Sequence, residues 1–243
     1  MTSYRDSHTG AKVGERYDAE HAVRLDALIW DAFVKPFVRQ QLGQAAAAGA
    51  TCYLDFACGT GRLLKVGHSV FHSSLGIDIS QDMLAVATQR VPDAALLRVD
   101  VTRDPPADMG PFDCVTMFRF VLNAESELRQ QALSWVAAHM SEGGILIVNN
   151  HRNSASVSGL LSRMAAWQPT GARNVMSRRH MFKMLENAGF AVVRCEGFRV
   201  LPSVWGRPVV GARLQLIGER LCRTLGLSRF GSELVVVARR VRD

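Results

Sequence analysis

A short apolar run that carries one acidic residue and leads into a glycine loop most constrains the fold of this chain. Residues 52–57 are rich in β-forming side chains and include Asp55, and the loop that follows contains Gly59 and Gly61. Glycine lets a backbone turn sharply and approach a ligand closely. We therefore expect a strand that ends in a tight turn, followed by a helix at 61–67 whose N-terminus faces a bound ligand.

Strand and helix patterns alternate along most of the remaining sequence. Short apolar runs predict strands, and apolar residues at helical spacing predict helices between them. This alternation implies an α/β fold with a doubly wound, mostly parallel seven-stranded sheet and helices on both faces. The predicted strands are residues 52–57, 74–78, 95–100, 112–118, 144–149, 190–195 and 233–239. The predicted helices are residues 18–41 with a kink or break at Pro36, 61–67, 80–90, 125–140, 177–188 and 209–225.

The length and composition fit one large domain that is preceded by a smaller extension. The chain has 243 residues and 48% of them are hydrophobic, which is enough to form a core without disulfides or metals. We assign residues 1–45 to a tail and an N-terminal helical lid, and residues 46–243 to the main domain. Insertions at about 153–176 and 197–231 interrupt its strand–helix pattern. The polar residues 1–14 lack the apolar segment of a secretory signal.

The cysteines are spread along the chain, and no two of them form a CxxC pair. Most lie in apolar runs of the kind expected for core strands, so we interpret them as buried, reduced thiols of a cytoplasmic protein. We predict no metal site, because clustered ligands for zinc are missing from the sequence. No apolar stretch approaches the ~18 residues of a membrane span. The five cysteines are Cys52, Cys58, Cys114, Cys195 and Cys222.

Charge is distributed unevenly between the two parts of the chain. Residues 1–150 carry 13 Lys/Arg and 17 Asp/Glu, whereas residues 151–243 carry 16 Lys/Arg and 5 Asp/Glu, so the net charges are −4 and +11. A basic C-terminal part indicates an acidic small molecule, an anionic lipid surface or nucleic acid as a partner. A solvated arginine-rich surface explains the same composition, and the sequence leaves these alternatives open.

Three aspartates lie at the ends of three consecutive predicted strands. Because the ends of neighbouring parallel strands meet at one edge of a sheet, Asp55, Asp78 and Asp100 are expected to share one crevice. There, Asp78 can accept hydrogen bonds from both ribose hydroxyls of an adenosine, and Asp100 can accept one from the adenine amino group. Met83 and Val101 can supply apolar contacts to the adenine ring.

The glycine loop differs from the fingerprint of dinucleotide-binding proteins. That fingerprint is G-x-G-x-x-G, and Leu64 stands where the third glycine belongs. A carboxylate at Asp55 would also be unfavourable beside a diphosphate, whereas it suits a cationic ligand with an ammonium and a sulfonium group. These features disfavour an NAD(P)-dependent oxidoreductase, which stays an alternative on the same type of sheet.

The loop and the aspartates together resemble class I S-adenosylmethionine-dependent methyltransferases. The resemblance covers residues 53–149 and, more loosely, the chain up to Arg239. It implies a Rossmann-like domain, S-adenosylmethionine as the cofactor and a cofactor site at the ends of the first strands. Ala57 stands where the family often has glycine, and we expect little consequence because alanine is small. The cofactor-binding residues implied are Asp55, Ala57, Gly59 and Gly61 at the methionine part, Asp78 and Ile79 at the ribose, Met83, Asp100 and Val101 at the adenine, and Phe118 nearby.

Two residues are candidates for the catalytic step. Arg119 follows the fourth predicted strand, where the resemblance places the transferable methyl group, and it can bind an acidic acceptor or the carboxylate of the cofactor. His151 directly follows the fifth predicted strand at the same edge of the sheet. Histidine titrates near neutral pH, so His151 is the best candidate for a general base.

The sequence thus predicts methyl transfer to an oxygen or nitrogen atom of a small molecule, including acidic, lipid-linked or glycan-linked acceptors. The Asn-Pro-Pro type of motif found in base-amino methyltransferases is missing, and the Asp-Pro-Pro-Ala of residues 104–107 follows the wrong strand. We therefore expect no nucleic-acid partner, although an RNA ribose or carbon methyltransferase and a non-catalytic binding protein remain alternatives. The amphipathic residues 209–225 can rest on a membrane surface, but ordinary core packing is the favoured interpretation. The oligomeric state stays open.

Overall fold

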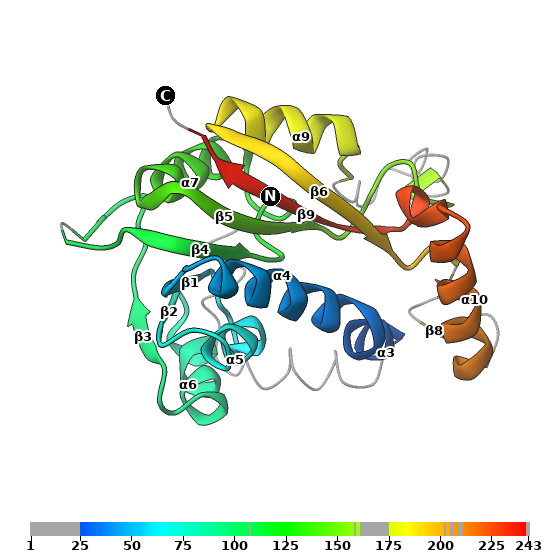
Figure 1. Ribbon diagram of the computed structural model, residues 1–243, viewed down its shortest axis with the longest axis horizontal. Coiled ribbons are helices and arrows are strands. Elements are labelled where there is room, and N and C mark those ends of the chain that lie inside the picture. The colour runs from blue at the N-terminus through cyan, green and yellow to red at the C-terminus, as the bar shows by residue number, and fades with distance from the viewer. Residues whose placement is uncertain are drawn as a thin grey trace.

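The chain folds around a seven-stranded sheet, which Figure 1 shows for the computed structural model. The structure describes residues 25–106, 108–157, 159–160, 175–201, 203–204, 207–208 and 211–241. The strands of the sheet are β1 (Cys52–Phe56), β2 (Ser73–Asp78), β3 (Ala95–Arg98), β4 (Phe112–Met117), β5 (Met140–Asn150), β6 (Phe190–Phe198) and β9 (Glu233–Arg240). Their spatial order is β3-β2-β1-β4-β5-β9-β6.

Most strand pairs in this sheet are parallel, and one reversed strand completes it. β1 pairs in parallel with β2 and β4, β2 with β3, and β4 with β5. β9 lies between β5 and β6 and runs antiparallel to both. The predicted mostly parallel, seven-stranded sheet is confirmed. The insertion of the last strand between β5 and β6 is a long-range feature that the local patterns did not indicate.

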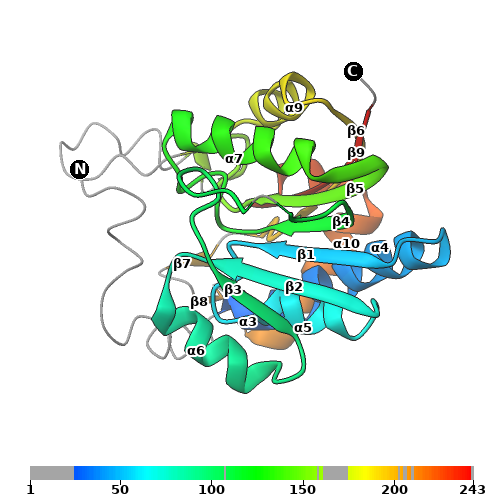
Figure 2. The same cartoon turned by 90° about the vertical axis from the view of Figure 1, so that its left-hand side faces the viewer.

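Helices cover both faces of the sheet, as predicted. Figure 2 shows α7 and α9 on one side and α4, α5 and α6 on the other. None of the helices in the described parts of the chain is both long and apolar enough to cross a membrane. The helices are α3 (Leu25–Ile29), α4 (Lys35–Ala47), α5 (Arg62–His68), α6 (Gln81–Arg90), α7 (Ser126–Ala138), α9 (Arg178–Asn187) and α10 (Ala212–Thr224), with the π-helical turn η1 (Trp30–Val34) and the 3-10 turn η2 (Leu227–Phe230).

Local sequence signals explain where several helices begin. Ser80 caps α6, because its hydroxyl accepts a hydrogen bond from the Met83 N–H at 3.4 Å. Ser177 caps α9 in the same way and accepts from the His180 N–H at 3.1 Å. Such caps satisfy N–H groups that have no partner within the first helical turn. Pro36 lies in the first turn of α4, directly after η1. Val34 and Lys35 both keep helical backbone angles, so the chain changes from π to α geometry just before this proline and is not broken there.

The N-terminal helical segment forms part of the layer on the sheet. α3, η1 and α4 contribute buried apolar side chains to the core cluster on this face, among them Phe33, Phe37 and Leu42. The first 24 residues of the predicted tail and lid lie outside the described residues. The division into a lid and a main domain therefore stays a prediction.

The two faces of β1 contribute to two separate core clusters. Leu54 and Phe56 pack into the cluster with α7 and α9, whereas Tyr53 packs with α4 and α5 on the other face. Successive side chains of a strand point to opposite faces, so Asp55 shares the face of Tyr53. Burial of a large apolar side chain such as Leu54 or Phe56 contributes about 1.5–3 kcal/mol to the stability of the fold. The strand is thus fixed from both sides where the glycine loop begins.

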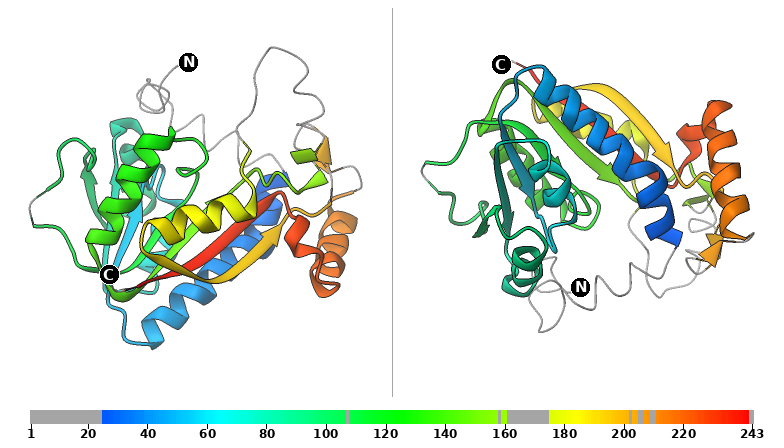
Figure 3. Two further views of the ribbon diagram at one scale, coloured as in Figure 1. Left: turned by 90° about the horizontal axis from the view of Figure 1, so that it is seen from above. Right: turned by 60° about the horizontal axis from the view of Figure 1, so that its bottom comes forward.

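The two insertions differ in how much of them is described. Of the first insertion, residues 161–174 lie outside the described residues. The second contains a small two-stranded sheet of β7 (Ser203–Val204) and β8 (Arg207–Pro208), followed by α10 and η2. Figures 1 and 3 show α10 at the opposite end of the molecule from β3 and α6.

We predict that Gly67→Ala destabilises the fold by about 1–3 kcal/mol, because a Cβ atom at this position would overlap the ring of Tyr53. That ring cannot easily move, since it is buried and stacks on Phe71 with 5.4 Å between centroids. Urea unfolding monitored by circular dichroism measures the change. Gly43→Ala in α4 is the matched control, because its Cβ meets no atom within 4 Å. Equal stability of the two variants would contradict this packing.

Candidate active site

A pocket opens where β1, β2 and β3 end, as the strand-end aspartates predicted. Its wall combines two carboxylates with apolar side chains from the strand ends and from α7. Five of the predicted cofactor residues line it: Ala57, Asp78, Ile79, Asp100 and Val101. The other lining residues were not predicted, and they are Phe56, Ile77, Val99, Thr102, Phe120 and Leu128.

Asp78, the last residue of β2, connects the turns that follow β1 and β2. Its Oδ2 accepts a hydrogen bond from the Gly59 N–H at 2.8 Å. Its Oδ1 accepts one from the Ser80 N–H at 2.9 Å. Charge-assisted bonds of this kind are about twice as strong as neutral ones. One carboxylate therefore fixes the spacing of two turns and stands at a defined place in the pocket wall.

Asp100 is held by the turn that follows β3. Its Oδ1 accepts hydrogen bonds from the Thr102 N–H at 3.1 Å and from the Thr102 hydroxyl at 2.6 Å. The Nε atom of Arg103 lies 3.9 Å from Oδ2 in a largely exposed ion pair, which contributes little. Thr102 was not among the predicted site residues, although the spacing Asp-x-Thr is typical of such turns.

Asp55 lies in the interior of the sheet and is not part of the pocket wall. Its side chain is 2% exposed, and its Oδ1 accepts a hydrogen bond from the Thr116 hydroxyl at 2.7 Å. That hydroxyl also lies 2.6 Å from the Tyr53 hydroxyl. No donor lies in hydrogen-bond geometry with Oδ2. The nearby Leu64 N–H, in the first turn of α5, nevertheless lowers the pKa of the Asp55 carboxyl. A direct contact between Asp55 and a cofactor stays a prediction.

Burial dominates the titration of Asp55. It raises the pKa of this carboxyl from the ordinary value of 3.8 to about 7, although the hydrogen bond from Thr116 and the nearby Leu64 N–H oppose the shift. The nearby charge of Asp78 raises the pKa further. A positive charge close to this carboxyl would favour the ionised form.

Three residues of the loop after β1 have a left-handed backbone conformation. Gly59 and Gly61 have φ angles of 54° and 74°, and Ala57 has a φ angle of 54°. Left-handed backbone costs an L-residue roughly 1–2 kcal/mol, so the replacement of glycine by Ala57 has an energetic cost that we did not expect. Gly61 is needed for close packing as well, because a Cβ there would lie 3.1 Å from the Cβ of Ala87 in α6.

Met83 supports the glycine loop rather than lining the pocket. Its side chain is 3% exposed, and its Sδ lies 4.0 Å from the place where a Cβ of Gly59 would be. Met83 belongs to the first turn of α6, which is capped by Ser80. The contact with the adenine ring that the sequence suggested for Met83 stays a prediction.

The loop after β4 faces the N-terminal helical segment. The ring of Phe118 meets the ring of Trp30 edge to face, with 6.4 Å between centroids. Arg119 has a φ angle of 59°, and its N–H donates to the Asn149 side chain at 2.7 Å. Asn149 in turn donates to Glu233 at 2.8 Å. Strained residues of this kind concentrate at functional sites, but neither Phe118 nor Arg119 lines the pocket.

His151 lies among buried amides at the end of β5. Its side chain is 7% exposed, and those of Asn150 and Asn153 are fully buried. Asn150 donates to the Met176 carbonyl at 2.8 Å, and Asn153 donates to the Gly231 carbonyl at 3.0 Å. These amides were missed, although three asparagines within five residues are a visible signal. His151 does not line the pocket, so its role as a base stays a prediction.

A second cavity, which we name the basic groove, lies between the N-terminal helical segment and α5. Arg62 stacks over the ring of Trp30, with 4.7 Å between the guanidinium carbon and the ring centroid. Trp30 thus connects the groove with Phe118. The groove is lined by Ala27, Trp30, Asp31, Lys35, Arg39, Arg62, Lys65, Val66, Ser69 and Arg90, which carry five positive charges and one negative charge.

Comparison with known proteins identifies the family. A family model described as a methyltransferase domain matches residues 30–194, about two thirds of the chain. The chain belongs to this methyltransferase-domain family. The match includes the glycine loop, the strand-end aspartates and the loop after β4, so the pocket lies within the matched residues. In the described parts of the domain, no three His, Cys, Asp or Glu residues are placed to hold a metal ion.

Curated relatives of this methyltransferase domain include enzymes that act on nucleotide-linked amino sugars. The dTDP-3-amino-3,4,6-trideoxy-alpha-D-glucopyranose N,N-dimethyltransferase of Streptomyces venezuelae is 37% identical over 101 residues, which cover 41% of this chain and 42% of the relative. The dTDP-3-amino-3,6-dideoxy-alpha-D-glucopyranose N,N-dimethyltransferase of Streptomyces fradiae is 35% identical over 153 residues, 58% of each chain. The chain thus spans about half the length of these relatives.

Solved structures show the same fold over nearly the whole chain. Magnesium protoporphyrin IX methyltransferase from Synechocystis PCC 6803, solved with bound SAH, aligns with a TM-score of 0.63 and covers 93% of both chains. The sequence identity is 16%, so this likeness concerns the fold. It supports the Rossmann-like class I arrangement that the sequence predicted.

We predict that the free energy of unfolding falls as the pH rises from about 4 to about 7, because folding raises the pKa of Asp55. In this window the folded state holds the proton that the unfolded state has already released. Asp55→Asn cannot ionise, so the fall should be smaller by about 1 kcal/mol or more. Urea titrations of both proteins at several pH values measure the difference. A wild type whose stability rises across this window relative to Asp55→Asn would contradict the assigned pKa.

Proposed function

We propose that this methyltransferase domain transfers a methyl group from S-adenosylmethionine to a nitrogen or oxygen atom of a small-molecule acceptor. The observation that carries the proposal is the pocket at the ends of β1, β2 and β3, where Asp78 and Asp100 stand in an otherwise mostly apolar wall. A nucleoside needs both features, since its ring is apolar on its faces and polar at its edge. The family supports the proposal.

The residues of the pocket fit an adenosyl group. Two backbone N–H groups fix the Asp78 carboxylate, so it can accept hydrogen bonds from ribose hydroxyls without a change of rotamer. Asp100 is fixed by Thr102 in the same manner and suits the adenine amino group. Ile79 and Val101 supply apolar contacts for the ring.

Positioning is the main contribution that we assign to the protein. S-adenosylmethionine, when bound, supplies a methyl group that is already activated by the sulfonium. The chain then needs to hold the acceptor in line with that group and to exclude water. Such positioning can lower a barrier by roughly 7–11 kcal/mol. Arg119 and Phe118, at the end of β4, are the proposed neighbours of the methyl group.

We further propose an acceptor that carries an acidic group, of the nucleotide-linked amino-sugar class. The basic groove supports this, because Lys35 and Arg39 of α4 line it together with Arg62 and Lys65 of α5. The groove meets the loop after β4 through the contact between Trp30 and Phe118. The two Streptomyces relatives are named for substrates with a dTDP group, which is anionic.

The competing functions have weaker support. Leu64, which stands in place of the third glycine of the dinucleotide fingerprint, is fully buried in the core. An NAD(P)-dependent oxidoreductase would therefore lack the close packing of helix against strand that the third glycine allows. A non-catalytic protein would need no acceptor site next to the cofactor.

We also propose a cytoplasmic location, since the five cysteines are unpaired.

Asp78→Ala is expected to weaken binding of S-adenosylhomocysteine by about 1–3 kcal/mol, or about 5–150-fold, because the ribose loses a charged acceptor. Isothermal titration calorimetry measures the dissociation constant. Asp93→Ala, which removes an exposed carboxylate after α6, is the control and should bind normally. An unchanged constant for Asp78→Ala would refute the placement, and binding of NAD(H) in place of S-adenosylhomocysteine would refute the proposed function.

Reversal of charge on both walls of the basic groove is expected to raise KM for an acidic acceptor roughly tenfold or more, because like charges then repel it. The variant is Arg39→Glu/Lys65→Glu, and a dTDP-linked amino sugar is the test substrate. Binding of S-adenosylhomocysteine should stay unchanged. The control is Arg179→Glu/Lys183→Glu on the exposed side of α9. Equal KM values for the two double variants would contradict the acidic acceptor.

His151→Ala is expected to lower kcat by about 10²- to 10⁴-fold if this histidine is the general base for the acceptor. The dissociation constant of S-adenosylhomocysteine should change much less. Turnover and calorimetry on the same preparation separate the two effects. A parallel loss of both would show that His151 supports the buried amides at the end of β5 and does not act as a base.

A further inference from the structure

The helix α10 buries two polar side chains and exposes most of its large apolar ones. Gln215 and Glu219 are each 1% exposed. Four large apolar side chains of the helix and its C-terminal end are exposed by 63%, 53%, 57% and 72%, and they are Leu214, Ile217, Leu221 and Leu225. Leu216 is partly buried against the core. This orientation is the reverse of the core packing that the sequence favoured for residues 209–225.

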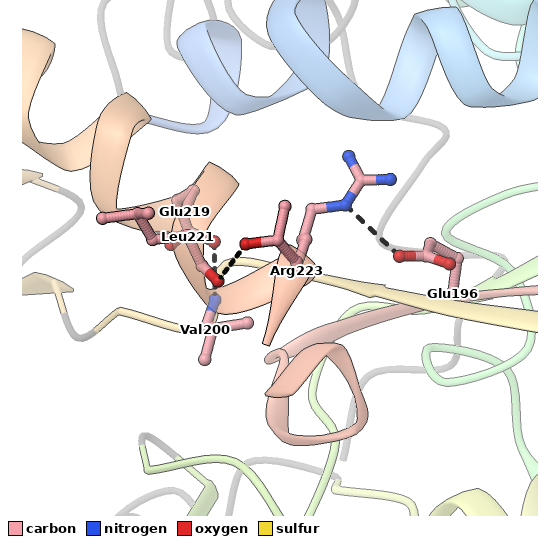
Figure 4. A network of polar contacts seen from close by, with 6 residues as sticks. Glu196, Val200, Glu219, Leu221 and Arg223 are labelled. Atoms are coloured by element: carbon pink, nitrogen blue, oxygen red, sulfur yellow. Dashed lines mark hydrogen bonds and ion pairs between the residues drawn. The ribbon is translucent and has the colours of Figure 1, made fainter. Parts of the chain in front are cut away.

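A polar network explains why the helix has this orientation. The two carboxylate oxygens of Glu219 accept hydrogen bonds from the Val200 and Leu201 N–H groups, each at 2.9 Å. Arg223 donates to Glu196 of β6 at 3.3 Å. Figure 4 shows Glu219 reaching toward Val200 and Arg223 toward Glu196. A rotation that buried the leucines would break these charge-assisted bonds, so the apolar face is held outward.

The outward face combines an apolar stripe with positive charge. Positions 214, 217, 221 and 225 are three or four residues apart, so their side chains lie along one side of the helix. Arg213 and Arg220 are exposed on the same helix. Residues 197–231 contain six arginines and one acidic residue, and that residue is the buried Glu219. The face therefore lacks any acidic side chain of α10 itself.

We propose that α10 binds an anionic lipid surface, with the apolar stripe entering the headgroup region and the arginines contacting acidic headgroups. Helices with an apolar face and arginines beside it bind membrane interfaces in this way. Charge argues against a second copy of this chain as the occupant, because two such faces would bring arginines together without acidic partners from α10. The location supports the proposal as well, since α10 lies at the far end of the molecule from β3 and α6 (Figure 3). The pocket at the β3 end is thus left accessible.

The experiment is co-sedimentation of the full chain with two kinds of vesicle. One contains phosphatidylcholine alone, and the other contains phosphatidylcholine and phosphatidylglycerol in equal amounts. The wild type should sediment with the anionic vesicles and much less with the neutral ones, and high salt should reduce the binding. Absence of sedimentation with anionic vesicles would overturn the proposal.

Variants of the exposed face assign the binding to α10. Leu214→Ser/Ile217→Ser/Leu221→Ser should lower the fraction bound about tenfold or more, and Arg213→Glu/Arg220→Glu should abolish the preference for anionic vesicles. Val193→Ser, at a valine of β6 that is 58% exposed, is the matched control and should bind as the wild type does. Circular dichroism and urea unfolding confirm that each variant is folded.

Three results would overturn the proposal. Undiminished binding by the serine variant would place the lipid contact elsewhere on the chain. A wild-type dimer in light scattering that the serine variant converts to monomer would assign the face to a second copy. Hydrogen exchange of α10 that becomes rapid only after deletion of residues 161–174 would show that this segment covers the face. It would make α10 part of the core.

Discussion

The carboxylate of Asp78 is the interaction on which the geometry of the pocket depends. It joins the turn after β1 to the turn after β2 through the N–H groups of Gly59 and Ser80. Because Gly59 adopts a left-handed backbone, its N–H can point toward the next strand. The same carboxylate stands in the pocket wall, so one side chain both shapes the site and offers it a negative charge. A substitution at Asp78 is therefore a structural change and a chemical change at once.

The three strand-end aspartates have different environments and, in our account, different roles. Asp78 and Asp100 line the pocket and are held by backbone N–H groups of the turns beside them. Asp55 lies inside the sheet, where burial raises its pKa to about 7 and Thr116 donates to it. We interpret Asp55 as a link between β1, β4 and the first turn of α5, and any effect on a cofactor would pass through the glycine loop that it precedes.

Features set by local chemistry could be predicted from the sequence. The strands, the caps Ser80 and Ser177 and the meeting of Asp78 with Asp100 follow from residue spacing and from parallel pairing. Features set by long-range contacts could not. The position of β9 between β5 and β6, and the part of Phe120 in the pocket wall, depend on segments that are distant in sequence.

The helix α10 shows the same limit of prediction in another form. Its amphipathic pattern indicates two different faces, but not which of them meets the protein. Glu219 decides this, because the Val200 and Leu201 N–H groups that it binds lie 19 and 18 residues earlier in the chain. A buried acidic residue with two backbone donors outweighs the usual preference for burying leucine. Composition alone does not reveal such a contact.

We thus propose three binding surfaces on this methyltransferase domain. The pocket binds the cofactor, the basic groove binds an acidic acceptor and α10 binds lipid. The pocket is central, because methyl transfer requires the bound cofactor whatever the acceptor or the lipid surface. A crystal structure of the chain with S-adenosylhomocysteine tests it most directly. Our account predicts the ribose hydroxyls within hydrogen-bond distance of Asp78 and the adenine amino group near Asp100. Ligand density elsewhere, with this pocket closed by its own side chains, would contradict it.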